Sequence, residues 1–184
     1  MRIRTDVRID RPRDDVFHRL AQEIDRTMPL ICPLTTSMRL DSDKPLAPGA
    51  TGKITVRSAF DSRTVDFAVT RYEVPERLSL EMRYGARSTQ SDYLFRDAGD
   101  GTTITLVTDA PAIGPRWLQN WNQRALERHE RQDAQRLKAF LEGRQADPAK
   151  AYRRSTVRLV LVACALGALL GVVWATYRAI TMGA

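Results

Sequence analysis

Apolar and polar residues alternate in short segments between residues 2 and 108 of the chain. Such alternation is typical of strands with one buried face. It occurs in residues 2–9 and again in six later segments, 36–41, 53–60, 64–72, 77–84, 89–96 and 102–108. Turn residues such as Gly99 and Gly101 separate neighbouring segments. The pattern therefore predicts an antiparallel meander with one apolar face.

Two other segments carry apolar residues at helical spacing. Pro12 suits the first turn of a helix, which we expect to end at Met28 and Pro29, with a short second helix or turn in 29–36. The longer helix is expected over 115–143, with Gly143 at its C-terminal cap. Because a sheet must bury its apolar face, this helix is expected to cover the sheet, which gives an α+β fold.

The C-terminal part of the chain has a different pattern, with no alternation and no polar stripe. Residues 159–175 contain no charge, and nine of these seventeen residues are Leu or Val. Extended to 157–177, a helix would be about 31 Å long, close to the thickness of a bilayer core. A helix that is apolar on every face is rare in soluble proteins. We therefore expect residues 157–177 to span a membrane once.

Charges beside this segment predict its orientation. Lys150, Arg153, Arg154 and Arg158 precede the apolar core, whereas Arg178 alone follows it. The positive-inside rule then places the N-terminal domain in the cytoplasm. The predicted organisation has four parts: a domain at 1–145, a basic juxtamembrane linker at 146–156, a transmembrane helix at 157–177 and a short tail at 178–184. This is a tail-anchored layout.

Net charge argues against nucleic acid as a partner. The chain has a formal charge of +7, but five of its 29 basic residues follow Pro148 and none of its 22 acidic residues does. Residues 1–148 therefore carry a net charge of only +2, and a nucleic-acid-binding domain usually carries a strongly basic patch. The excess of positive charge lies where anionic lipid headgroups would meet it.

Catalytic and cofactor motifs give little support to an enzyme. The chain has no Gly-x-Ser-x-Gly elbow, no P-loop and no GxGxxG. Its two histidines, His18 and His129, lie on the first and last predicted helices, where solvated or core-edge roles are commoner than catalysis. With only Cys32 and Cys164 and no CxxC, a zinc site is not expected. We expect no cofactor, no metal and no assigned catalytic residue.

Four segments resemble a known family in their order and spacing. They are VRIDRPRDDVFHRL at 7–20, VTRYEVPERLSLEM at 69–82, FRDAGDGTTITL at 95–106 and RLKAFLEG at 136–143. Together they resemble the START-like, or polyketide cyclase/dehydrase and lipid-transport, superfamily (SRPBCC, Bet v 1-like). The resemblance implies a helix-grip fold, in which a curved antiparallel sheet wraps around a long C-terminal helix and encloses a cavity. It implies no catalytic residue, because the family has no universal catalytic motif.

Candidate cavity residues follow from the apolar faces of the predicted strands and from the last helix. They are Phe60, Phe67, Leu80, Met82, Tyr84, Tyr93, Trp117 and Trp121. Tyr84 and Tyr93 could donate hydrogen bonds to a ligand carbonyl, although core tyrosines with satisfied hydroxyls are commoner. Trp117 and Trp121 are four residues apart and could form an aromatic gate at a cavity mouth, or they could be ordinary core anchors.

Small residues in the predicted membrane helix offer a packing seam. Gly167 and Gly171 form a GxxxG pair, and Ala163 and Ala175 extend its spacing on the same helix face. Such faces let helix backbones approach and favour dimers. Glycine is also common in membrane helices generally, so both a homodimer and a simple tether remain open.

Three functions are compatible with these features. The first is a membrane-tethered module that binds a hydrophobic small molecule or lipid, such as an isoprenoid, quinone or polyketide, for transfer or presentation. The second is a cyclase or dehydratase acting on a hydrophobic substrate. The third is a protein-interaction module at the membrane with a collapsed cavity. The absence of a paired acid/base motif favours the first over the second, and the sequence does not separate the first from the third.

The membrane prediction can be tested with the whole chain. The full chain should remain in the membrane fraction after carbonate extraction, because residues 157–177 favour the bilayer by about 3–5 kcal/mol through their leucines and valines. A chain ending at Asp147 should be released. A cysteine reporter at Gly183 should be labelled only from the non-cytoplasmic side, and labelling from the cytoplasmic side would overturn the orientation.

Overall fold

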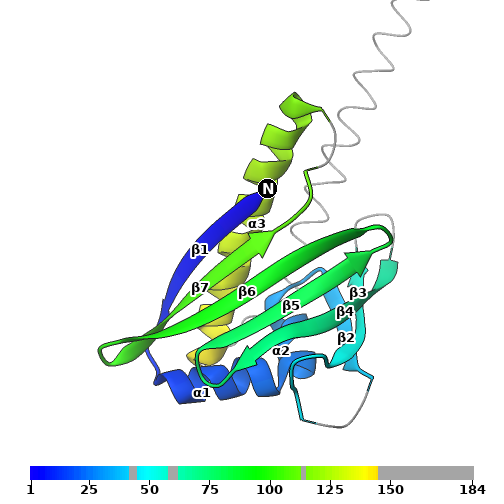
Figure 1. Cartoon of the computed structure of the whole chain (residues 1–184). Helices are drawn as coiled ribbons and strands as arrows, with labels where there is room; N and C mark the ends of the chain where they lie inside the picture. Colours follow the sequence, from blue (N-terminus) through cyan, green and yellow to red (C-terminus); the bar gives the residue numbers. More distant parts are fainter. Residues whose placement is uncertain (42–44, 58–61, 113–114, 145–184) are drawn as a thin grey trace, which may run out of the picture.

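The computed structural model describes residues 1–41, 45–57, 62–112 and 115–144 (Figure 1). The described chain begins with β1 (Arg2–Ile9), α1 (Arg13–Phe17), the π-helical turn η1 (His18–Gln22) and α2 (Ile24–Ile31). Six strands follow: β2 (Thr35–Leu40), β3 (Thr51–Arg57), β4 (Ser62–Glu73), β5 (Arg77–Tyr84), β6 (Arg87–Ala98) and β7 (Gly101–Asp109). The last element is the long helix α3 (Arg116–Leu141).

All seven strands form one antiparallel sheet in the order β1-β7-β6-β5-β4-β3-β2. The six consecutive strands form the predicted meander, and β1 joins it by pairing with β7, with Ile3 opposite Thr108 and Ile9 opposite Thr102. Helices α1 and α2 therefore connect strands at opposite edges of the sheet. Curvature of the sheet around α3 completes the helix-grip fold, so the expected fold of the N-terminal domain is confirmed.

The first helical segment differs from the prediction. We expected one helix ending at Pro29, but the helix breaks earlier, at Glu23, where φ is −108° and ψ is 33°. Helix α2 then continues through Pro29 and ends at Ile31. Its Ile24, Met28 and Ile31 are buried, so packing in the core favours a helix through a residue that disfavours one in isolation.

The C-terminal half of α3 is fixed firmly to β1 and to the loop that follows it. Leu137 and Leu141 are buried in the same cluster as Ile9. The Lys138 ammonium donates a hydrogen bond to the carbonyl of Arg8 at 2.6 Å, and the backbone N–H of Asp10 donates to the Glu142 carboxylate. Buried apolar contacts and charged hydrogen bonds therefore act at the same place.

A glycine ends α3 as predicted. Gly143 has a φ of +75°, a conformation that residues with a side chain rarely adopt. The N–H of Gly143 bonds to the carbonyl of Phe140, and the N–H of Arg144 bonds to that of Ala139. These two bonds define a Schellman motif, which satisfies carbonyls that the end of a helix leaves free.

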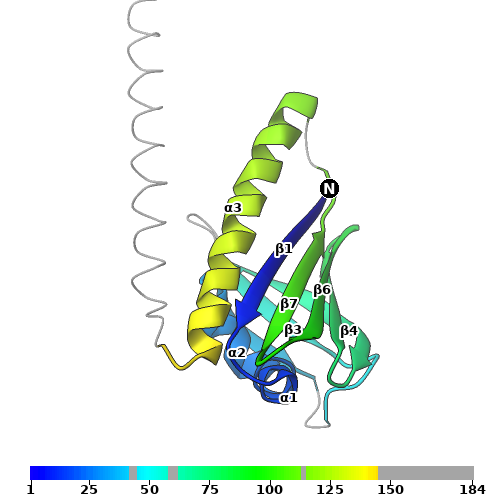
Figure 2. The ribbon, with the colours of Figure 1, turned by 90° about the vertical axis from the view of Figure 1, so that its left-hand side faces the viewer.

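The side chains that the structure describes in the N-terminal half of α3 are less buried. Trp121 is 63% exposed, and Asn122 and Leu126 are only half-buried, whereas Ala134, Leu137 and Leu141 are fully buried. Figure 2 shows α3 on one side of the molecule, facing the sheet, with α1 and α2 close to its C-terminal end. Burial of the described α3 side chains thus increases from Trp121 toward Leu141.

The expected membrane segment lies outside the described residues, as do Phe60, Gly167, Gly171 and the linker from 146 onward. Among the helices that the structure describes, none is long and apolar enough to cross a bilayer.

Leu141 gives a direct test of how α3 is held. Leu141→Ala should lower the free energy of unfolding by about 2–5 kcal/mol, because it removes a fully buried side chain and leaves a cavity at the fixed end of the helix. Urea denaturation of the full chain would measure the change. Leu30→Ala is the matched control, since Leu30 is 40% exposed and the same substitution there should cost far less. Equal losses would show that α3 is not fixed through Leu141.

Candidate functional site

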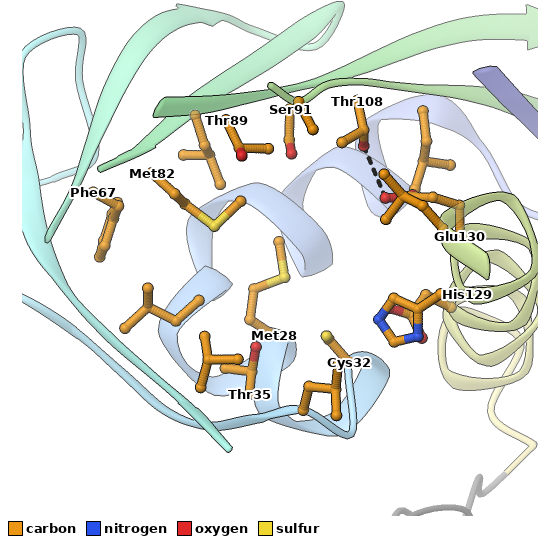
Figure 3. Close-up of a pocket in the computed structure, with 18 of the residues that line it drawn as sticks. Met28, Cys32, Thr35, Phe67, Met82, Thr89, Ser91, Thr108, His129 and Glu130 are labelled. Carbon is orange, nitrogen blue, oxygen red and sulfur yellow. Dashed lines mark hydrogen bonds and ion pairs between the residues drawn. The ribbon is translucent and has the colours of Figure 1, made fainter. Parts of the chain in front are cut away.

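A cavity of about 710 Å³ lies between the concave face of the sheet and helices α2 and α3 (Figure 3). Strands β2 to β7 contribute side chains on the sheet side, and Met28, Ile31 and Cys32 approach from α2 and its end. Leu126 and Leu137 contribute from α3. The α3 residues that line the cavity therefore come from both halves of the helix, from Asn122 to Leu137.

Most of the cavity lining is apolar. The strands supply Met38, Ile54, Val56, Phe67, Leu80, Met82 and Leu106. Figure 3 shows Met28 and Met82 directed into the open space from opposite sides. Methionine side chains are flexible and polarizable, so they can adjust to ligands of different shape.

Five of the predicted site residues line this cavity, namely Phe67, Leu80, Met82, Tyr84 and Tyr93. Trp121 does not belong to the lining and is largely exposed, because α3 lies away from the sheet at that point. Trp117 lies within α3, but its side chain is outside the described part of the structure, as is the whole of Phe60. The aromatic gate of Trp117 and Trp121 stays a prediction.

The hydroxyl groups of the two tyrosines that line the cavity donate hydrogen bonds to methionine sulfur atoms. The hydroxyl of Tyr93 donates to Met28 Sδ at 3.9 Å, and that of Tyr84 donates to Met82 Sδ at 3.8 Å. A thioether is a weak acceptor, so a ligand oxygen could replace it at little cost. Burial raises the pKa of Tyr93 well above its usual value, which keeps the hydroxyl protonated and able to donate.

Polar side chains gather at the α3 side of the cavity. His129, Glu130 and Asp133 come from one face of α3, Thr108 from β7 and Cys32 from the end of α2. The Thr108 hydroxyl donates to Glu130 Oε1 at 2.9 Å, as the dashed line in Figure 3 marks. His129 Nε2 lies 3.3 Å from Asp133 Oδ2, and the Arg136 guanidinium lies 2.7 Å from Asp133 Oδ1.

Burial raises the pKa of three side chains in this polar group, which favours the protonated form of each. It raises the pKa of Glu130, which the nearby Asp133 carboxylate raises further, and it raises the pKa of Asp133 despite His129 and Arg136. Burial also raises the pKa of the Cys32 thiol to about 12. A thiol with so high a pKa is protonated at neutral pH and is a poor nucleophile.

This polar group was not predicted from the sequence. The sequence predicts a solvated or core-edge role for both His18 and His129, and it predicts neither a catalytic residue nor a metal site. The spacing of His129 and Asp133, at i and i+4 on a helix with a buried stripe, indicates that both share a face. No pattern in the sequence indicates that Cys32, about a hundred residues earlier, lies beside them.

The structure is therefore a helix-grip domain with a mainly apolar cavity large enough for a small-molecule ligand. The chain belongs to the family described as polyketide cyclase / dehydrase and lipid transport, whose model matches residues 1–142. This establishes the family that the sequence resembled. No curated protein matches the chain.

Solved structures share this fold at low sequence identity. The crystal structure of TTHA0849 from Thermus thermophilus is 13% identical, with a TM-score of 0.64 over 79% of this chain and 100% of that one. Ara h 8.0201 is 11% identical, with a TM-score of 0.60 over 77% of this chain and 97% of that one. The di-domain ARO/CYC StfQ from the steffimycin biosynthetic pathway is 12% identical, with a TM-score of 0.61 over 78% of this chain and 51% of that one.

Filling the cavity should block apolar ligands without unfolding the domain. Ser91 points into the open space from β6 (Figure 3), so Ser91→Trp should place an indole there. Binding of the fluorescent probe 1-anilinonaphthalene-8-sulfonate should weaken tenfold or more, while the melting temperature changes little. Ser88→Trp is the matched control, because Ser88 is an exposed residue of the same strand. Loss of stability in Ser91→Trp with no loss of probe binding would indicate a solid interior.

Proposed function

We propose that this protein binds a hydrophobic small molecule or lipid, of isoprenoid, quinone or polyketide type, for transfer or presentation. The single observation that carries the proposal is the cavity of about 710 Å³ with its mainly apolar lining. Small-molecule sites usually measure about 300–1,000 Å³ and combine apolar walls with a few polar groups. A collapsed interior, which the protein-interaction alternative assumes, fits this cavity poorly.

The ligand should be apolar along most of its length, with an oxygen function at one end. The apolar walls of β3 to β5 can bury hydrocarbon, at about 25 cal/mol per Å² of apolar surface removed from water. The hydroxyl of Tyr93 can donate a hydrogen bond to a carbonyl or hydroxyl oxygen, and Glu130, whose pKa is raised by burial, lies at the polar side of the same cavity. A fully charged ligand end is disfavoured, because burial already raises the pKa of both Glu130 and Asp133 nearby.

The membrane tether remains part of this proposal. The uncharged run at 159–175 and the basic residues before it support a tail anchored in the bilayer, with the binding domain on the cytoplasmic side. Tethering would raise the effective concentration of the cavity near lipid-dissolved ligands. Self-association through Gly167 and Gly171 would place two such domains side by side.

A cyclase or dehydratase activity is the second candidate, and one specific observation favours it. Glu130 and His129 both border the cavity, and burial raises the pKa of Glu130 in the direction that suits a general acid. The fold shared with StfQ, whose name describes an ARO/CYC protein, is compatible with this candidate.

A displacement assay tests the binding proposal. The purified full chain is loaded with 1-anilinonaphthalene-8-sulfonate and titrated with a long isoprenoid alcohol, a quinone, a fatty acid and a polycyclic aromatic polyketide. At least one should displace the probe with micromolar affinity, about −8 kcal/mol, and Ser91→Trp should lose this binding while Ser88→Trp keeps it. If none of the four displaces the probe from the wild-type chain, the proposal fails.

Mass spectrometry of the recovered ligand separates the two candidates. A binding protein returns its ligand unchanged, whereas a dehydratase returns a product lighter by one water molecule. Glu130→Gln should abolish such a conversion if Glu130 is the general acid, and should alter only affinity if the protein binds without reaction.

A further inference from the structure

Three different metal-ligating side chains meet at the polar end of the cavity. They are Cys32 at the end of α2, and His129 and Asp133 on α3. The sulfur, an imidazole nitrogen and a carboxylate oxygen all lie within 4.8 Å of one another. We propose that Cys32, His129 and Asp133 bind a single divalent transition-metal ion of the zinc class, with one coordination position open to the cavity.

The distances suit a small tetrahedral ion. With metal–ligand bonds of about 2.0–2.3 Å, donor atoms around a tetrahedral zinc ion lie about 3.3–3.8 Å apart. His129 Nε2 and Asp133 Oδ2 are already 3.3 Å apart. The largest separation in the group, at most 4.8 Å, exceeds this range by about 1 Å, so binding of an ion requires side-chain movements of that size.

The scaffold holds two of the donors in a fixed relation. His129 and Asp133 lie one helical turn apart on the same face of α3. Arg136 binds Asp133 through Oδ1, so the carboxylate is oriented with Oδ2 toward His129. Partners of this kind orient the ligands that bind the ion directly in metal proteins. Cys32 follows the last residue of α2, and α2 packs against α3.

The type of donor indicates the type of ion. A metal ion that binds a cysteine displaces the proton of its thiol, and the resulting thiolate, together with an imidazole, favours zinc and its neighbours among the transition metals. Magnesium and calcium prefer oxygen ligands alone. Three protein ligands leave a fourth position, as in zinc sites that bind water or substrate. All three residues line the cavity, so this position can accept water or an oxygen of the bound molecule.

The competing interpretation is an ordinary ion pair between His129 and Asp133, strengthened by Arg136. That interpretation explains the two α3 residues, and it treats Cys32 as a protonated thiol hydrogen-bonded to Asp133. The two interpretations differ in one measurable respect, which is direct bonding of Cys32 to an added metal ion.

Cobalt(II) titration of the purified full chain, kept reduced with a non-coordinating phosphine, tests the proposal. We expect a thiolate-to-cobalt charge-transfer band that saturates at one ion per chain and disappears when zinc is added. Cys32→Ser should abolish this band, and Asp133→Asn should weaken cobalt binding tenfold or more while keeping it. The matched controls are Cys164→Ser and His18→Gln, which alter the other cysteine and the other histidine and should leave the titration unchanged.

Two results would overturn the metal site. The first is a wild-type chain that gives no charge-transfer band in excess cobalt, since this measurement needs no variant and does not depend on the folding of one. The second is a band that survives Cys32→Ser or is lost in Cys164→Ser. Either result would leave His129 and Asp133 as an ion pair. Displacement of the apolar probe is measured without metal, so failure of the metal site and failure of the binding proposal are distinguishable.

Discussion

The contact between the C-terminal half of α3 and the start of the chain holds the helix that forms one wall of the cavity. Leu137 and Leu141 are buried there with Ile9, and Lys138 and Glu142 bond to backbone groups of Arg8 and Asp10. These interactions fix one end of a helix of 26 residues. The sheet curves, whereas the helix continues past it, so its N-terminal half is less buried. The cavity lies between this helix and the curved sheet.

The cavity has two chemically different sides. The strands contribute aliphatic, methionine and aromatic side chains, whereas α3 contributes an imidazole and two carboxyl groups. Burial raises the pKa of Glu130 and of Asp133, because removal from water disfavours the charged form of each carboxyl group. A molecule with a long apolar body and one oxygen function matches both sides. The same polar side also provides the sulfur, nitrogen and oxygen donors of the proposed metal site.

Local patterns in the sequence were sufficient to predict the strands, the long helix and the cap at Gly143. The positions of Phe67, Leu80 and Met82 on an inward face followed from alternation along single strands. Contacts between distant segments were not predictable in this way. Cys32 lies close to His129 only because α2 packs against α3. No pattern of residues in the sequence predicts that packing. Trp121 was expected at the cavity because it is apolar and on the helix, but burial depends on where the helix leaves the sheet.

The methionines offer the most direct measurement of whether the interior is hollow and accepts an apolar molecule. Met1, Met28, Met38 and Met82 line the cavity, and the fifth methionine, Met182, lies in the C-terminal tail. With ¹³C-labelled methionine methyl groups, NMR titration of the full chain with an apolar ligand should shift the signals of Met28, Met38 and Met82 together and leave Met182 unchanged. Unchanged signals for these three residues at a saturating ligand concentration would contradict the account.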